Sequence, residues 1–315
     1  MENAAMPDAK LSGNNVNFGD VRYGSPINRT LELENIGRVP AQFQFIPKPG
    51  EKRATKPWLW INPAMEIVNP GEKIQLNFTV NIQKETAPEF NMNDEELSDI
   101  LVLHLKNGKD MFITITGNYL KSCMGCSFGY LVQFQKPIRT GSPMGTDNKK
   151  RLLKIPKELW RVIEWLHKNA LDEEEIFCQQ GDAEACTTIR ECLDTGMKFP
   201  EDLDAHSMAE TMLALLETQE EALFPPNLYK IVIEAVTYAS AKQVVSYLPD
   251  CNFNIFYYIM SFLRELLQHK DKNALTSDIL AATFSQVMIR SQKSTTHTTL
   301  QCKKFIHHFL NEKEP

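Results

Sequence analysis

The sequence predicts a chain with two different folds, an immunoglobulin-like β-sandwich followed by an all-α domain. In residues 11–135, several short segments alternate apolar and polar residues, as strands with one buried face do. From Pro156 onward, apolar residues recur every three or four positions, as on one face of a helix. The 315 residues are enough for two domains of ordinary size.

The expected strands of the first half are separated by turn segments rich in Gly, Pro and Asn. The alternating segments are INRTLELENI, AQFQFIP, KIQLNFTV, ILVLHL and MFITITGN, with turns such as NIG, KPGEK, NPGEK and KNGKD between them. Phe43 and Phe45 have the parity of core residues. Trp58 and Trp60 share one parity in KPWLWINP, and we expect both in the core or between the domains. Short strands at this spacing are typical of a sandwich.

The second half is expected to be helical after a linker. Residues 136–153 are rich in Gly, Pro, Ser and Lys and have little periodicity. The expected helices are KELWRVIEWLHKNAL, DAEACTTIRECLDTG, SMAETMLALLE, LYKIVIEAVTYA, AKQVVSYL, NIFYYIMSFLRELLQH, TSDILAATFSQVMI and TLQCKKFIHHFL. The expected domain boundaries are a disordered N-terminus at 1–10, the sandwich at 11–135, the linker at 136–153 and the helical domain at 154–315.

Composition excludes several classes of function. The net charge of −6 and the lack of a basic stripe argue against a nucleic-acid partner. No run of 18 apolar residues occurs, so we expect no direct membrane insertion. The first ten residues lack the apolar core of a secretory signal, so we expect a cytoplasmic monomer with reduced cysteines. The CxxC of Cys123-Met124-Gly125-Cys126 has no second ligand pair, so neither metal nor cofactor is expected.

Two sets of motifs carry a resemblance to known families. Phe18-Gly19-Asp20-Val21, Gly24 and the string LELENIGRVPAQFQF resemble the ASH domain, a relative of the major sperm protein (MSP) sandwiches. The strings EEEIFCQQGDAEACTTIRECLDTG, LYKIVIEAV, FNIFYYIMSFLRELLQH and TSDILAATFSQVMIR resemble a RhoGAP domain. In this order, and with SDILVLHLKNGKDMFITITGNYLKSC and IPKELW, the chain resembles the C-terminal half of the OCRL and type II inositol polyphosphate 5-phosphatase family.

The resemblance implies a targeting module and not an enzyme. The family's phosphatase domain precedes this region, and its catalytic strings are absent from these residues. The implied partners are GTP-loaded Rab proteins, endocytic adaptors with short Phe–His helical motifs and, more weakly, Rho-family GTPases such as Rac or Cdc42. The implied role is membrane trafficking and signal transduction at endosomes, the Golgi, plasma-membrane endocytic sites and the cilium.

The RhoGAP-like half lacks the residues that the resembled family uses for catalysis. That family inserts an arginine, placed just after the Phe of a loop like IFRxxG, into the GTPase site. Here Cys178 holds that position, and a neutral thiol offers one weak donor where a guanidinium offers five. Leu213 and Glu217 replace a lysine and an arginine, and Asp278 replaces an asparagine. The resemblance therefore implies a RhoGAP-like domain without catalytic activity.

Phe112 is the first candidate binding residue. On its strand it shares a face with Thr114 and Thr116, and an aromatic side chain on such a face is a natural partner anchor. In the resembled family this strand contributes to Rab binding. The alternative is that Phe112 packs against the helical domain. Gly108, in the preceding KNGKD turn, is grouped with this site because it shapes the hairpin, and it need not touch a partner.

Trp160 and Trp165 are the candidate binding residues of the first helix after the linker. At 100° per residue, they lie on opposite flanks of the apolar stripe, so we expect partial exposure. The tryptophan of IPKELW resembles a residue of the family's Phe–His adaptor site, which would hold an amphipathic helix in an apolar groove. The alternative for both is packing between the domains.

Two other functions remain open from the sequence. One is an active Rho GTPase-activating protein, in which another arginine such as Arg190 would reach the GTPase. Arg190 lies inside the IRECLD helix, which is poor geometry for that task. The other is an ASH-type ciliary or cytoskeletal structural protein without a GTPase partner.

Overall fold

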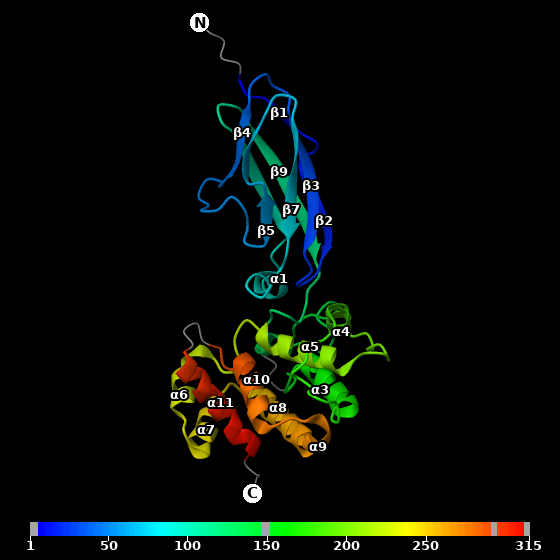
Figure 1. Ribbon diagram of the computed structural model, residues 1–315, viewed down its shortest axis with the longest axis vertical. Helices are drawn as coiled ribbons and strands as arrows, with labels where there is room; N and C mark the ends of the chain where they lie inside the picture. The colour runs from blue at the N-terminus through cyan, green and yellow to red at the C-terminus, as the bar shows by residue number, and fades with distance from the viewer. Residues whose placement is uncertain (1–5, 146–151, 291–294, 312–315) are drawn as a thin grey trace. The chain divides into compact units, whose positions relative to one another are not determined.

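A computed structural model of the chain describes residues 6–145, 152–290 and 295–311. The chain divides between Lys121 and Ser122 into two compact units. Unit 1 contains the strands, coloured blue to green in Figure 1, and unit 2 is helical, coloured green to red. The predicted combination of a β-sandwich with an all-α domain is confirmed.

Unit 1 is a sandwich of two sheets. The four-stranded sheet has the order β1 (Ala9–Leu11), β3 (Ile27–Asn35), β7 (Lys73–Val80) and β5 (Leu59–Asn62). The five-stranded sheet has the order β2 (Asn15–Val21), β9 (Asp110–Tyr119), β8 (Ser98–Leu105), β4 (Ala41–Ile46) and β6 (Met65–Val68). The parallel pair is β2 with β9, and the pairings of the other strands named here are antiparallel.

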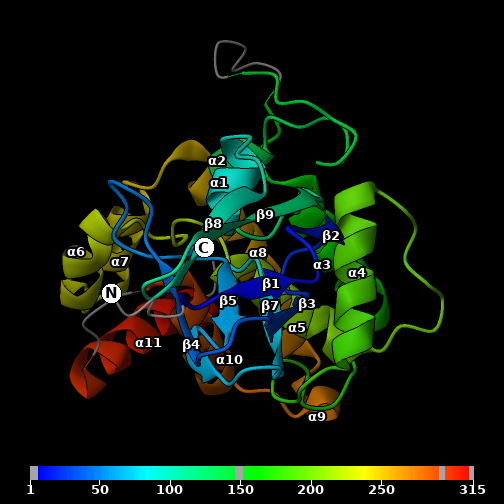
Figure 2. The same cartoon turned by 90° about the horizontal axis from the view of Figure 1, so that it is seen from above.

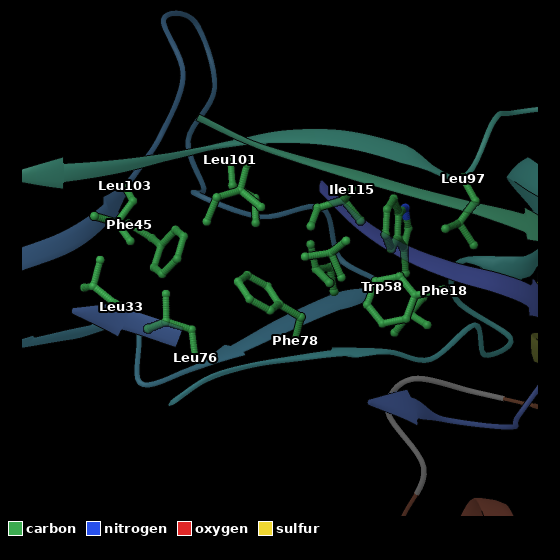
Figure 3. Packing of buried hydrophobic residues seen from close by; sticks show 14 of the residues in the cluster. Phe18, Leu33, Phe45, Trp58, Leu76, Phe78, Leu97, Leu101, Leu103 and Ile115 are labelled. Carbon is green, nitrogen blue, oxygen red and sulfur yellow. The ribbon is translucent and has the colours of Figure 1, made fainter. Parts of the chain in front are cut away.

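The core of unit 1 lies between the sheets, because alternation places the apolar residues of each strand on one side. In β7 this set is Leu76, Phe78 and Val80, all buried. The rings of Phe45 and Phe78, from opposite sheets, meet edge-on with centroids 6.2 Å apart. Figure 3 shows side chains of the two sheets pointing toward one another. Phe43 and Phe45 are core residues, as their parity predicts.

Gly19 interrupts the alternation of β2. Its φ is 67°, and the register with β9 shifts between Asn17 and Asp20. The Gly19 N–H donates to the Asn17 side-chain oxygen at 2.8 Å. The extra residue of this bulge lets both Phe18 and Val21 face the core, although they are three positions apart. The string FGDV is therefore the sequence of a β-bulge.

The structure differs from the sequence prediction at the N-terminus. Residues 9–11 form β1, which pairs Ala9 with Asn35 and Leu11 with Leu33 of β3, where disorder was expected over residues 1–10. The pairing satisfies backbone groups that β3 would otherwise expose at its edge. Residues 1–5 of the expected tail lie outside the described residues.

Trp58 and Trp60 do not share one environment, contrary to their predicted common parity. Trp58 precedes β5 and is buried against Phe90 of α1 (Ala87–Met92), with ring centroids 6.1 Å apart. Trp60 lies within β5, opposite Thr79, and is 51% exposed on the outer face. Strand parity does not apply to Trp58, because Trp58 lies in the turn before β5 begins. The prediction also missed α1.

Unit 2 is made of helices packed around a second core. Its longer helices are α3 (Lys157–Asn169), α4 (Ala183–Thr195), α5 (Ala205–Glu217), α7 (Tyr238–Val245), α8 (Asp250–Gln268), α10 (Ser277–Met288) and α11 (Thr296–Asn311). The short ones are α2 (Phe128–Leu131), η2 (Pro226–Leu228), α6 (Tyr229–Glu234) and α9 (Lys270–Asn273). Helix α5 packs against α3, α4 and α10, while α6 and α7 lie beside α11 (Figures 1 and 2).

The helix ends follow local capping signals. The Asp182 carboxylate accepts from the Ala185 N–H and begins α4, and Gly196 ends it in the left-handed conformation. The expected helix LYKIVIEAVTYA ends early, at Glu234 of α6, and its last two residues begin α7, which continues into the expected helix AKQVVSYL. Thr237 forms a capping box with Ser240, and this box begins a new helix after the break.

The segment that follows β9 packs with the helices. Because the units divide after Lys121, residues 122–135, which we expected in the sandwich, belong to unit 2. Helix α2 lies in this segment and packs against α8. The Cys126 carbonyl accepts from the Glu220 N–H at 2.7 Å. The strand alternation ends near Tyr119, and the apolar residues beyond it are buried among helices.

Asp194 of α4 is the buried centre of this attachment. Its Oδ1 accepts from the Cys123 N–H at 2.7 Å. Arg139 donates to Asp194 Oδ2 at 3.5 Å and bonds both carboxylate oxygens of Glu191. The expected linker 136–153 is therefore attached to α4 at Arg139, whereas residues 146–151 lie outside the described part of the chain.

Asp194→Asn should reduce the pH dependence of the stability of unit 2. Burial raises the pKa of the Asp194 carboxyl to about 6, although hydrogen bonds from Cys123 and Ser122 and the charge of Arg139 oppose the rise. Its stabilising contribution is therefore complete below pH 3.8, the ordinary pKa, and is lost as pH rises through about 6. Between pH 5 and 7 the loss amounts to about 1 kcal/mol.

Urea unfolding of the wild-type and substituted chains across this pH range measures the difference. Asp202→Asn, at an exposed position, is the matched control and should leave the pH dependence unchanged. Equal pH dependence in wild type and Asp194→Asn would contradict the assignment.

Candidate functional site

The outer face of the five-stranded sheet carries an apolar ridge. Ile46 of β4, Val102 of β8 and Phe112 of β9 lie directly opposite one another in register. Ile100, two residues before Val102, extends the same face. Phe112 is 59% exposed and Ile100 is 51% exposed. These four residues form what we call the sheet ridge, a contiguous apolar patch of the kind found at interaction sites.

The outer face of the four-stranded sheet is polar on β3 and β7, and Trp60 of β5 is its exposed aromatic residue. Its outward residues on β3 and β7 are Asn28, Thr30, Glu32, Glu34, Lys73, Gln75, Asn77 and Thr79. Lys73 forms ion pairs with Glu32 at 2.8 Å and Glu34 at 3.6 Å. The ridge on the five-stranded sheet combines the exposed Phe112 and Ile100 with the half-buried Ile46 and the buried Val102. This apolar ridge distinguishes the five-stranded sheet.

Gly108 lies in the turn that leads into β9. Its N–H donates to the Leu105 carbonyl at 2.9 Å, and Asn107 has a φ of 59°. A Cβ at position 108 would lie 2.9 Å from the Leu105 Cβ and 3.1 Å from the Pro7 carbonyl oxygen. The turn and the close approach of the chain at Pro7 therefore require glycine here.

An open groove of about 900 Å³ runs along the solvent side of α3. Trp160, which is 49% exposed, and the half-buried Trp165 both line it. Phe199 and Pro200, from the segment after α4, line it as well. Helical spacing placed the two tryptophans on opposite flanks of the buried stripe. One groove reaches both because it extends across the exposed face of the helix.

Arg161 holds one wall of this groove in place. Its Nη1 donates to the Cys192 carbonyl at 2.7 Å, and its Nη2 donates to the Met197 carbonyl. The guanidinium carbon lies 4.5 Å from the centre of the Phe199 ring, within cation–π range. The segment that begins at Met197 is thereby attached to α3.

The loop at residues 176–181 is anchored by Phe177, and Cys178 is exposed beside it. The Phe177 ring is buried against Phe262 of α8 and Phe284 of α10, with centroid distances of 6.4 and 5.1 Å. Its φ of 70° is in the left-handed region, which costs a non-glycine residue about 1–2 kcal/mol. The Cys178 N–H donates to the Glu175 carbonyl at 2.9 Å. Packing of the ring therefore holds a strained loop.

The Cys178 side chain is a neutral thiol at ordinary pH. Burial raises the pKa of this thiol, and the nearby Glu175 carboxylate raises it further. A protonated thiol donates one weak hydrogen bond and carries no charge. It therefore cannot supply the electrostatic stabilisation that a guanidinium gives to a developing negative charge.

The other three predicted positions lie on α5 and α10, which pack against each other. Leu213 is half-buried on α5, and Glu217 is exposed in its last turn. Asp278 is exposed in the first turn of α10 and pairs with Lys303 of α11 at 2.6 Å. The loop that carries Cys178 is also tied to α5, because the Gly181 N–H donates to a Glu210 carboxylate oxygen at 2.6 Å.

Comparison with known families accounts for both units. Residues 11–119 match the ASH domain of the inositol polyphosphate 5-phosphatase OCRL-like type, and residues 156–293 match the RhoGAP domain. The chain is an ASH–RhoGAP pair of the OCRL type. The predicted resemblance is confirmed in both its halves.

Two curated relatives and one solved structure are similar to it. Mouse type II inositol 1,4,5-trisphosphate 5-phosphatase is 35% identical over 98% of this chain and 33% of its own length. Mouse Rho GTPase-activating protein 22 is 26% identical over 48% of this chain and 23% of its own length. The crystal structure of human Rho GTPase activating protein 15 has a TM-score of 0.48 and 16% identity, covering 57% of this chain and 90% of that one. The chain thus spans about a third of the phosphatase and a quarter of the Rho GTPase-activating protein 22.

Arg190 of the RhoGAP domain lies away from the Cys178 loop. Its Nη2 donates to Thr187 Oγ1 at 3.3 Å on the same helix. The loop joins the N-terminus of α4 at Asp182, and the helix rises about 12 Å from there to Arg190. Arg190 is therefore a poor substitute for an arginine at position 178.

Asn273 organises the base of the Cys178 loop, and sequence reasoning missed it. Its buried Nδ2 donates to the carbonyls of Leu171 and Leu266 at 2.9 and 2.8 Å. The backbone carbonyl of Asn273 accepts from the Glu175 N–H at 2.8 Å. In the sequence it is one polar residue among many in QHKDKNALTSD, so composition gave no signal for this role.

The described residues contain neither a cluster of metal-ligating side chains nor a helix that could span a membrane. In this part of the chain, no group of three or more His, Cys, Asp or Glu side chains could hold a metal ion. No helix described by the structure is long and apolar enough to cross a bilayer. All seven cysteines, which are among the described residues, are free thiols.

Proposed function

We propose that this ASH–RhoGAP pair is an interaction and targeting module whose ASH domain binds GTP-loaded Rab proteins. The observation that carries the proposal is the sheet ridge, where Phe112 is 59% exposed beside three aliphatic side chains. Exposed aromatic anchors in compact apolar patches are typical binding hot spots. Because the γ-phosphate orders the switch segments of a GTPase, a partner that contacts them distinguishes GTP from GDP.

The α3 groove of the RhoGAP domain is the proposed second site, for endocytic adaptors with Phe–His helical motifs. Trp160, Trp165 and Phe199 supply aromatic lining on an open surface. An amphipathic helix laid into an apolar groove is a recurring mode of peptide recognition. The groove is built from α3 and the segment after α4, so it does not involve the Cys178 loop.

The proposed role of the RhoGAP domain toward Rho-family GTPases such as Rac or Cdc42 is weak binding without acceleration of GTP hydrolysis. The fold that presents the loop is supported by Phe177 and Asn273. The residue presented is Cys178, whose neutral thiol lacks the charge of a catalytic arginine. In other systems such an arginine contributes roughly 10³–10⁵ in rate.

In a longer protein, the module would place an inositol phosphatase on membranes. The mouse relative is a type II inositol 1,4,5-trisphosphate 5-phosphatase, and the chain covers 33% of it. Recruitment by Rab proteins and adaptors would direct the enzyme from the cytoplasm to endosomes, the Golgi and endocytic sites of the plasma membrane. The module itself supplies location and no chemistry.

The test is binding of the chain to a panel of Rab proteins, each loaded with GDP or with a GTP analogue. We expect at least one Rab protein to bind at least about tenfold tighter in the GTP form, a difference of about 1.4 kcal/mol. No binding across the panel would contradict the Rab proposal. That result would favour an ASH-type structural protein without a GTPase partner.

A further inference from the structure

We infer that the α3 groove accepts helical adaptor segments that carry acidic residues beside their aromatic anchor, and that Lys168 and Lys198 select for those residues. This inference rests on the proposed adaptor function of the groove and adds a charge requirement to it. The observation behind it is that some charged side chains of the groove are bonded to other residues of the domain, whereas Lys168 and Lys198 form no ion pair with the described residues.

The apolar part of the groove has two sides. Trp160 and Trp165 belong to α3, and Phe199 and Pro200 belong to the segment opposite. An aromatic or aliphatic side chain of a bound helix would lie between them, since aromatic rings give large contact area at low entropic cost. Apolar contact alone does not distinguish one amphipathic helix from another, so selectivity must come from polar groups around it.

Three polar side chains that line the groove are engaged within the domain. Arg161 donates to backbone carbonyls on the wall segment. Glu164 accepts from the Tyr258 hydroxyl of α8 at 3.3 Å. His167 lies 2.9 Å from a Glu265 carboxylate oxygen, also on α8. These hydrogen bonds fix the side chains in the walls and leave their formal charges unchanged. The positive charge of Arg161 and the negative charge of Glu164 offset each other.

The remaining charged groups favour an anionic partner. Lys168 on α3 and Lys198 on the opposite wall are both exposed, and neither forms an ion pair with the described residues. Glu201 is the one carboxylate of the lining that is likewise unengaged. Two free ammonium groups on the two sides of one aromatic lining therefore outnumber a single free carboxylate. A helix with acidic residues flanking its aromatic anchor complements this arrangement.

Arg161 is a positioning residue for this site. It keeps Phe199 within the groove through the 4.5 Å stacking contact and fixes the Met197 carbonyl at the base of the wall. Lys198 lies between these two contacts in sequence, so Arg161 also determines where its ammonium group can reach. The thiol of Cys192 adds a contact to the Lys198 carbonyl at 3.4 Å.

The experiment uses the full chain and three labelled helical peptides of about 15 residues. Each peptide carries one Phe and one His four positions apart, on the same helical face. The flanking positions are Glu in the first, Gln in the second and Lys in the third. Affinities are measured at about 50 mM and 300 mM salt, for wild type, Lys168→Gln with Lys198→Gln, and Trp160→Ala.

We expect the Glu peptide to bind about five- to tenfold tighter than the Gln peptide at low salt, as two exposed ion pairs allow. The preference should shrink at high salt and disappear in the double lysine variant, which should still bind the Gln peptide as wild type does. Lys242→Gln, on the exposed side of α7, is the matched control and should keep the preference. Trp160→Ala should weaken all three peptides.

Three results would contradict the charge requirement or the groove itself. Equal affinity of wild type for the Glu and Gln peptides would overturn the charge requirement and leave the adaptor groove standing. Persistence of the preference in the double lysine variant would overturn the assignment to Lys168 and Lys198. Absence of binding by every peptide would overturn both the adaptor function and the inference that rests on it.

Discussion

Phe112→Asp should lower the affinity of the chain for a GTP-loaded Rab partner by about 30-fold or more, which corresponds to about 2 kcal/mol. The substitution removes the aromatic anchor of the sheet ridge and places a carboxylate opposite Val102. On binding, that carboxylate would have to lose water within an apolar contact. Because Phe112 is 59% exposed, the free energy of unfolding should change by less than about 1 kcal/mol. A binding titration together with urea unfolding measures both effects.

Trp60→Asp is the matched control for this experiment. Trp60 is also an exposed aromatic residue within a strand, but it lies on the outer face of the other sheet. The same change of charge there should leave Rab binding unaltered. Equal losses of affinity from the two substitutions would indicate an effect of added negative charge and would contradict a specific contact at the ridge.

Phe177→Ala should destabilise the RhoGAP domain by about 3–5 kcal/mol, the usual cost of removing a buried phenylalanine ring. The substitution leaves a cavity beside Phe262 and Phe284 and removes two edge-on ring contacts. Alanine also retains the penalty of a left-handed backbone at φ 70° without the packing that offsets it. The loop that presents Cys178 should therefore open. Denaturant unfolding, with hydrogen exchange at residues 175–181, reports both the domain and the loop.

The comparison variant is Phe253→Ala on α8. The Phe253 ring is 38% exposed, and its centroid lies 4.8 Å from that of the Tyr257 ring. Its cost should be about 1 kcal/mol or less, because water can fill the space that the ring leaves. If Phe177→Ala lowered the free energy of unfolding no more than Phe253→Ala does, the conformation of the loop would not depend on its buried ring. Faster exchange confined to the loop would separate local opening from global unfolding.

Periodicity was enough to predict the two folds. Alternation in KIQLNFTV identified the buried side of β7, and the 3.6-residue period of KELWRVIEWLHKN identified the buried side of α3. Both patterns work because each element has one apolar face, and that face is packed in the core. The same patterns indicated that Phe112 lies on the outer face of β9 and that Trp160 lies beside the buried stripe of α3.

Local pattern failed where a side chain is positioned by distant backbone. The buried Asn35 side chain donates to the carbonyls of Val39 and Val68, each at 2.8 Å, yet in sequence it is one residue of a turn. Asp194 looks like an ordinary helix-end carboxylate, but it is buried beneath the Cys123 N–H of a segment 71 positions earlier. Such contacts depend on the tertiary fold, and no short window of sequence contains both partners.

The candidate binding residues could be selected one by one from the sequence, but the residues around them could not. Phe112 could be selected from β9 alone, whereas the ridge needs Ile46 and Val102, which the sheet register brings opposite it. Trp160 and Trp165 could be selected from α3 alone, whereas the groove needs Phe199 from the segment after α4. Lys168 and Lys198 could be selected as candidate ligand-binding residues only after the structure showed which other charged side chains of the groove are bonded within the domain.

Single-turnover GTP hydrolysis by Rac or Cdc42, measured with an excess of this chain, tests most directly the claim that the pair is a binding module without catalysis. With Cys178 in the position of the catalytic arginine, the account predicts a hydrolysis rate within about twofold of the GTPase alone, while a RhoGAP protein with its arginine accelerates the same sample by roughly 10³–10⁵. Acceleration by this chain of about a hundredfold or more would contradict the account, because it would require a cation that the Cys178 loop does not present.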